Sequence, residues 1–167
     1  MKGDGHVPET EEYGIGSFVW RMPMTDPRPF HPERLADAMK GFGHLVQPVA
    51  SATGEQPEWP FVGVVRCKGQ FWFADAHAIP VDIHTAGRHV NMEAGRPFLA
   101  AVPRTEWNAE AHAQYEQTVQ AGLWHHESKE DENSYAFGDR ASVLVIIGVD
   151  MTAERKSLIT EALNRSL

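Results

Sequence analysis

The chain has 167 residues, of which 42% are hydrophobic and 23% charged, a composition typical of a globular protein with one substantial core. Its formal net charge of −8 gives no electrostatic support to a nucleic-acid-binding surface, so we expect no nucleic-acid partner. No apolar run approaches the ~20 residues that span a bilayer, and a single cysteine excludes an internal disulfide, so we expect a cytoplasmic protein without membrane contact.

The first third of the chain predicts one strand and one helix between irregular segments. Residues 1–12 are polar and show no periodicity, so we expect a flexible arm there, the end of a linker. Ile15–Arg21 alternates large apolar and smaller side chains, as a strand does. Pro32 suits the first turn of a helix that stops by Gly41, and the prolines and glycine of residues 46–60 predict an irregular loop.

The stretch Phe61–Phe73, with the sequence FVGVVRCKGQFWF, organises the rest of the chain. Its β-branched and aromatic residues favour a pleated surface, and because Gly69 accepts a positive φ, we predict a tight hairpin at Lys68-Gly69. Alternation then places Phe61, Val65 and Cys67 on one face, and Val64, Arg66 and Lys68 on the other. Further strands are predicted at Ile79–Ile83 and Arg88–Met92, joined around Gly87.

The C-terminal half predicts two helices and a central strand. Trp107, Ala111, Tyr115 and Val119 lie four apart and give one narrow apolar stripe on a polar helix. Glu127–Glu132 has the composition of a solvated loop, Ser142–Val149 is apolar on both faces, and Thr152 can cap the last helix. Because strands and helices segregate, we expect an α+β domain over residues 13–167, with a mostly antiparallel sheet of four to five strands and helices on one face.

Several motifs resemble one known family. Arg66-x-Lys68-Gly69 followed by Phe71-Trp72 resembles the centre of the C-terminal domain of CobW-type proteins, the cobalamin-synthesis W family of GTP-dependent metal chaperones. Further segments agree with that domain in the same order, namely Glu9–Ile15, Pro29–Leu35, Ala86-Gly87, Gly138–Arg140 and Leu144–Gly148. The resemblance implies the same α+β class and a regulatory and interaction module that works with a GTPase.

The chemistry of that family is incomplete in this chain. No lysine closes a Gly-rich phosphate-binding loop, and one cysteine cannot supply the family's Cys-x-Cys-Cys metal motif. The resemblance therefore implies that GTP hydrolysis lies in a separate domain, and the linker-like start favours an excised C-terminal domain over a stand-alone relative. No nucleophile is paired with a base, so we expect no enzyme activity, and a small hydrolase or isomerase ranks last among the functions considered.

The predicted interaction residues lie mostly on the central strands. They are Arg66, Lys68, Gly69, Trp72, Gly87, Arg88 and Arg140. The two glycines are included because they occupy positions of the family's motifs. The cations would form a basic face in an acidic protein, and guanidinium groups bind carboxylates and phosphates. We expect this face to dock on the GTPase domain of the same or another chain, or on a client metalloprotein. In the alternative interpretation, Arg66 and Arg140 only pair with acidic residues such as Asp139 or Glu93.

Nine histidines open a second possibility. The metal-ligand candidates are His125, His126 and Glu127, which are consecutive, and His84 with His89 on neighbouring strands. Imidazole and carboxylate suit zinc or cobalt, so these residues predict a self-sufficient zinc-binding module as the alternative function. A solvated loop and ordinary strand histidines are the competing interpretations of the two clusters, and we expect no other cofactor in the domain itself.

Overall fold

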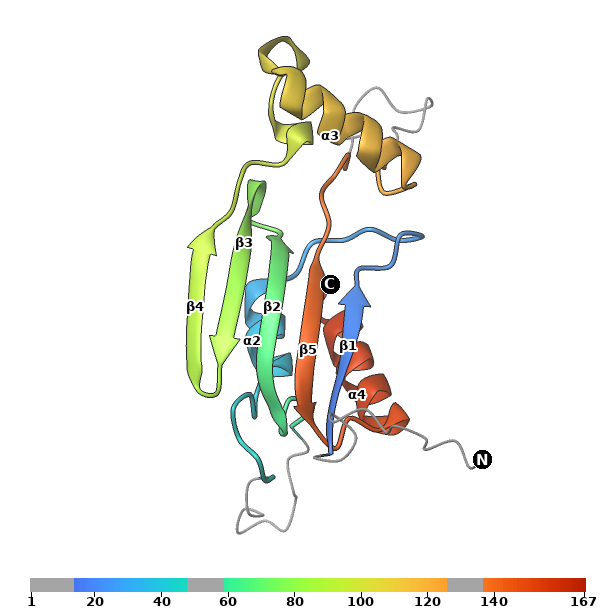
Figure 1. Cartoon of the computed structure of the whole chain (residues 1–167). Coiled ribbons are helices and arrows are strands. Elements are labelled where there is room, and N and C mark those ends of the chain that lie inside the picture. Colours follow the sequence, from blue (N-terminus) through green and yellow to red (C-terminus); the bar gives the residue numbers. More distant parts are fainter. Residues whose placement is uncertain (1–13, 48–58, 126–136) are drawn as a thin grey trace, which may run out of the picture.

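The computed structural model describes residues 14–47, 59–125 and 137–167, and its centre is a five-stranded antiparallel sheet in the order β1-β5-β2-β3-β4 (Figure 1). The strands are β1 (Ile15–Arg21), β2 (Val64–Phe73), β3 (Ala76–Ala86), β4 (His89–Ala94) and β5 (Val143–Val149). The helices are α2 (Pro32–Ala38), α3 (Ala109–Gln120) and α4 (Ala153–Arg165), with 3-10 turns η1 (Leu99–Ala101) and η2 (Arg104–Glu106) before α3. The predicted α+β class is confirmed. The predicted arm and the loop at Glu127–Glu132 lie outside the described residues.

Helices α2 and α4 cover one face of the sheet and lie behind the strands in the view of Figure 1. Alternation along β5 turns Leu144 and Ile146 toward this helical layer, where both side chains are fully buried. The ring of Phe30, just before α2, lies 5.4 Å from the ring of Trp20 and 5.5 Å from that of Phe71. The core therefore lies between these helices and the sheet. No described helix is long and apolar enough to cross a membrane.

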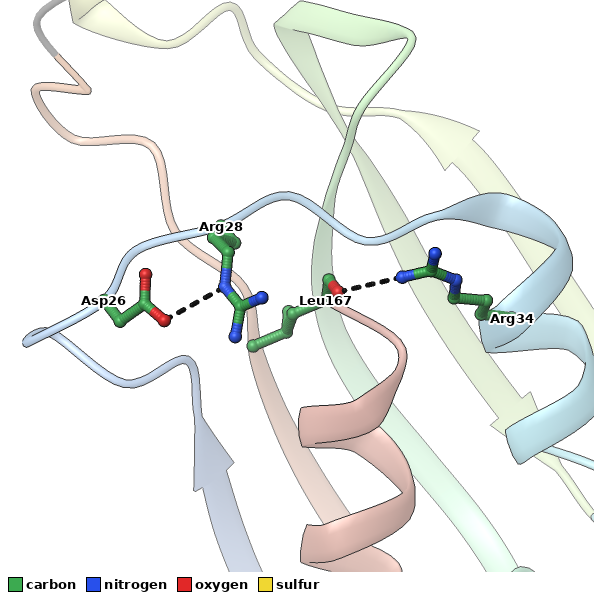
Figure 2. Close-up of polar contacts among 4 residues, drawn as sticks. All are labelled: Asp26, Arg28, Arg34 and Leu167. Carbon is green, nitrogen blue, oxygen red and sulfur yellow. Dashed lines mark hydrogen bonds and ion pairs between the residues drawn. The ribbon is translucent and has the colours of Figure 1, made fainter.

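The helical layer is held together where α4 ends beside α2. The hydroxyl of Ser166 donates to the main-chain carbonyl of Arg34 at 3.3 Å. The guanidinium of Arg34 donates in turn to the main-chain oxygen of Leu167 at 3.5 Å, and Asp26 pairs with Arg28 at 3.1 Å in the segment that leads to α2 (Figure 2). The two hydrogen bonds of Arg34 with Ser166 and Leu167 join the end of α4 to α2.

The prediction of a hairpin turn at Lys68-Gly69 is wrong. Strand β2 continues through this pair to Phe73, and the chain reverses into β3 at Ala74-Asp75. At Gly69, where φ is +156°, an added Cβ would overlap the main-chain carbonyl oxygen of Val143 on β5. The glycine therefore serves the close approach of β2 and β5 rather than a turn.

The prediction of which β2 residues share a face is partly wrong, because the strand contains a bulge. Val64 and Cys67 are both fully buried on the helical side, because the register against β5 shifts between Val64 and Arg66. This bulge moves Val64 away from the face on which strict alternation puts it. Arg66 and Lys68 are exposed together on the opposite face, as predicted.

Helix α3 lies beyond the end of the sheet (Figure 1), whereas we predicted that the helices share one face. Asn108 caps α3 by accepting a hydrogen bond from the Ala111 N–H at 2.9 Å. None of its residues is buried against the sheet. Instead the rings of Trp107, Tyr115 and Trp124 pack on one another at centroid distances between 4.7 and 6.3 Å. The predicted apolar stripe therefore packs in a local aromatic cluster.

Burial makes the thiol of Cys67 inert in the folded chain, and it raises the pKa of that thiol from 9.0 to about 12. Because the thiolate is the nucleophile, we expect Ellman's reagent at about pH 8 to react only after unfolding in urea. Above about pH 9 the unfolded chain loses this proton while the folded chain keeps it, so the free energy of unfolding should fall between about pH 9 and 12. Rapid stoichiometric reaction in native buffer would contradict the buried position.

Candidate functional site

The face of the sheet opposite α2 and α4, called the open face below, presents alternate residues of all five strands. They are Ile15, Ser17, Val19 and Arg21 of β1, Val143, Val145, Ile147 and Val149 of β5, Arg66, Lys68 and Gln70 of β2, Asp82, His84 and Ala86 of β3, and His89, Asn91 and Glu93 of β4. The strand register sets which of these side chains are neighbours. One row across the face runs Val19, Val145, Lys68, His84.

Two cations of β2 lie beside an apolar strip on this face. Lys68 is opposite Val145, and Arg66 is opposite Ile147. Val19 and Val145, which pair with each other, are 52% and 40% exposed. Among the described residues, neither Arg66 nor Lys68 forms an ion pair through its side chain. A contiguous exposed apolar strip with available charges at its border is typical of a protein-interaction surface.

The four predicted basic residues do not all come together. Arg88 follows Gly87 in the turn between β3 and β4, at one end of the sheet. Arg140 lies at the other end, where its Nε donates to the carbonyl of His77 at 2.6 Å. His77 and His84, the neighbour of Lys68, are separated along β3 by on the order of 23 Å at ~3.3 Å per residue. Arg140 is therefore not part of the basic face.

We predicted that Trp72 is an interaction residue. In the structure its side chain is fully buried, so the indole is not available to a partner. Its Nε1–H donates to Nδ1 of His77 at 3.0 Å, and its ring lies 5.5 Å from the ring of Phe137. Its backbone N–H donates to the hydroxyl of Ser142 at 2.8 Å. Phe137 and Ser142, which precede β5, thus cover this end of β2. They bury Trp72 although its side chain lies on the side of the open face.

His84 and His89 both lie on the open face, as the strand pairing predicted. The register makes them diagonal neighbours, at about 7–8 Å between main chains in such pairs. Lys68 lies directly opposite His84, and its ammonium group repels a cation at that position. Within the described residues, no three His, Cys, Asp or Glu side chains gather where they could hold a metal ion.

His125 is the one member of the consecutive cluster that the structure describes. Its backbone N–H donates to the carbonyl of Gly138 at 2.8 Å, and burial lowers the pKa of its imidazole, which favours the neutral ring. Its Nε2 is buried and has no hydrogen-bond partner in the described part of the chain. His126 and Glu127 lie outside the described residues, so the cluster as a whole stays a prediction.

A cleft of about 740 Å³ lies between α3 and the adjoining end of the open face. Buried Met22, Phe98 and Ser142 contribute to its lining. The charged groups of the lining have both signs, namely Arg21, Arg96, Asp82, Glu110 and Asp139. The described lining contains no histidine or cysteine, and the hydroxyl of Ser142 already accepts the Trp72 N–H. The cleft therefore offers no nucleophile with a paired base, and a hydrolase gains no support from it.

The family comparison agrees with this architecture. A family model described as the cobalamin synthesis protein cobW C-terminal domain matches residues 15–167, which include all five strands and the three helices. The chain belongs to the CobW C-terminal domain family. The resemblance found in the sequence motifs is thereby confirmed.

Two relatives place this CobW C-terminal domain among longer proteins. The chain is 29% identical over 163 residues to "Zinc-regulated GTPase metalloprotein activator 1" of Dictyostelium discoideum, covering 97% of this chain and 27% of that protein. A solved structure of zinc-bound YjiA GTPase from E. coli aligns with a TM-score of 0.47 at 16% identity, covering 99% of this chain and 34% of that one. The chain thus spans about a third or less of each relative.

The Gly138–Arg140 motif of this CobW C-terminal domain forms a junction between α3 and the sheet. The carboxylate of Asp139 accepts hydrogen bonds from the backbone N–H groups of Leu99 at 2.8 Å and Ala100 at 3.0 Å. An added Cβ at Gly138 would overlap the side chain of Ala100. Burial lowers the pKa of the Arg140 guanidinium, and the charge of Asp139 opposes that shift. The motif therefore has a structural role that spacing alone did not reveal.

Sequence reasoning missed the apolar part of the open face. Ile15, Val19 and Val145 were taken only as strand residues, yet each is at least 39% exposed. The apolar character of Ser142–Val149 on both sides pointed to a central strand, either covered on each side or in the middle of the sheet, and β5 does lie in the middle, between β1 and β2. The described helices cover one side of β5, and on the other side Val145 is 40% exposed.

Proposed function

We propose that this CobW C-terminal domain is a non-catalytic interaction module of a GTP-dependent metal chaperone, and that its open face docks on the GTPase domain. The observation that carries the proposal is the strip of exposed Val19 and Val145 beside Arg66 and Lys68, neither of which has an ion-pair partner within the described chain. Such a surface fits a partner with an apolar ridge bordered by carboxylates.

Two observations support the proposal that GTP hydrolysis belongs to a separate domain: the sequence of this chain and the length of its curated relative. The curated relative is called a zinc-regulated GTPase, and this chain corresponds to 27% of it. The sequence contains no phosphate-binding loop, so GTP hydrolysis would belong to the remaining part of such a protein. Zinc is the metal that the relative's name supports, with cobalt the other candidate, and the site of action would be the cytoplasm. A client metalloprotein is a further partner of the assembled chaperone.

Docking is tested by calorimetry with a separately produced GTPase domain of the CobW family from the same organism, loaded with GTP or GDP. We expect Arg66→Ala/Lys68→Ala to weaken binding by at least about tenfold, because two charge-assisted contacts at the border of the interface are lost. The fold should be unaffected, since both side chains are exposed.

The matched control is Lys156→Ala/Arg165→Ala, which removes the same two charges from α4 in the helical layer. This variant should bind like the parent chain. Equal affinity of the Arg66→Ala/Lys68→Ala chain and the parent chain would rule out the open face as the docking surface.

A further inference from the structure

Strand β4 is an edge of the sheet that the described strands form, and it has few of the features that protect such edges. It lies at the outside of the sheet (Figure 1), and all six of its residues are exposed. It contains no proline or lysine, and its register against β3 runs without a bulge. Val90 and Met92 are 49% and 51% exposed on the side of the sheet that carries the helices. An edge of this kind is a template for another strand.

The hydrogen-bond pattern shows which backbone groups this edge offers. The Gly95 N–H donates to the Pro80 carbonyl at 2.9 Å, one step beyond the end of β4. Because bonded positions alternate along an antiparallel ladder, the backbone groups of His89, Asn91 and Glu93 bond to β3. The N–H and C=O groups of the alternate residues, Val90 and Met92 among them, therefore point away from the sheet.

When two copies of β4 are paired antiparallel, the side chains that face each other are complementary. In an antiparallel pair centred on Asn91, Val90 of one copy lies opposite Met92 of the other, and these are the positions whose backbone groups point outward. His89 lies opposite Glu93 in the same register, where the carboxylate accepts a hydrogen bond from the imidazole. Asn91 meets Asn91 at the centre. Apolar, charged and amide groups each meet a suitable partner.

We propose that two copies of this chain associate through β4 about a two-fold axis at Asn91, joining their sheets into one of ten strands. The axis is perpendicular to the sheet, so both open faces lie on the same side of the dimer. The interface is separate from the Arg66–Lys68 strip and does not depend on the docking proposal. Pairing of short strands buries less area than a standard protein interface, so the association is weak, with a dissociation constant on the order of 0.1–1 mM.

Sedimentation equilibrium of the 167-residue chain from about 10 μM to about 1 mM tests the dimer. We expect the weight-average mass to rise from 18.6 kDa toward twice that value. Met92→Pro removes an N–H that points away from β3, so this variant should keep its own sheet, checked by circular dichroism, and remain monomeric. A parent chain that stays monomeric, or a folded Met92→Pro chain that still dimerises, would overturn the proposal.

A charge swap tests the register without a proline. Glu93→His places two imidazoles opposite each other and should weaken association by about tenfold or more, whereas His89→Glu/Glu93→His restores the pair and should recover the parent affinity. Glu116→His on the exposed surface of α3 is the matched control and should leave association unchanged. Failure of the swap to rescue the single variant would exclude this pairing of β4.

Discussion

Replacing Gly69 with alanine is expected to lower the free energy of unfolding by about 4 kcal/mol or more, a large part of the stability of a domain this size. The new Cβ would overlap the main-chain carbonyl oxygen of Val143, and its next neighbours are also backbone atoms of β5. Backbone cannot move aside as a flexible side chain does, so β2 and β5 would have to separate at the centre of the sheet. The φ of +156° adds conformational strain for any residue with a Cβ. Urea denaturation followed by circular dichroism measures the loss.

Gly87→Ala is the matched control for this prediction. Gly87 also has a positive φ, +57°, but an added Cβ there meets no atom within 4 Å among the described residues. Only the backbone strain remains, and we expect a cost of about 1 kcal/mol. Similar losses for the two variants would mean that β2 and β5 do not approach each other as closely as the structure has them.

Trp72→Ala is expected to destabilise the fold by about 4 kcal/mol, within the range for removing a large buried aromatic side chain. The indole is fully buried and packs against Phe137, so its removal leaves a cavity where the segment before β5 covers the sheet. The hydrogen bond from its Nε1 to His77 is lost as well. Thermal and urea unfolding measure the change in the free energy of unfolding.

Trp72→Phe separates the contribution of the ring from that of the hydrogen bond. Phenylalanine keeps most of the apolar contact with Phe137, while the exposed imidazole of His77 can turn to water, so we expect a loss of about 1–2 kcal/mol. If Trp72→Ala were no more costly than an exposed substitution, Trp72 would be accessible at the surface, as a predicted interaction residue would have to be.

Elements whose signals are local could be predicted from the sequence. The strand Ile15–Arg21 has the predicted limits, because its alternation belongs to the strand itself. The last helix begins after Thr152, whose hydroxyl accepts the Arg155 N–H at 3.2 Å as the capping pattern predicts. The middle helix was also identified by its four-residue spacing, although the spacing did not reveal that it lies beyond the sheet.

Features that depend on distant contacts could not be predicted in this way. Lys68-Gly69 has the same local chemistry as a hairpin turn, and only the approach of β5 shows why a glycine is required there. The burial of Trp72 depends on a segment about 70 positions later in the chain. Alternation correctly put Arg66 and Lys68 on one exposed face, whereas the place of Arg140 depends on the topology of the sheet.

The most direct test of the docking account is a titration of ¹⁵N-labelled chain with the unlabelled GTPase domain, followed by amide chemical shifts. We expect the largest shift changes on the open face of β1, β5 and β2, at Val19, Val145 and Lys68 and their neighbours. The helical layer of α2 and α4 should change little. Shifts confined to that helical layer or to α3, or none at saturating GTPase domain, would contradict the assignment of the open face as the docking surface.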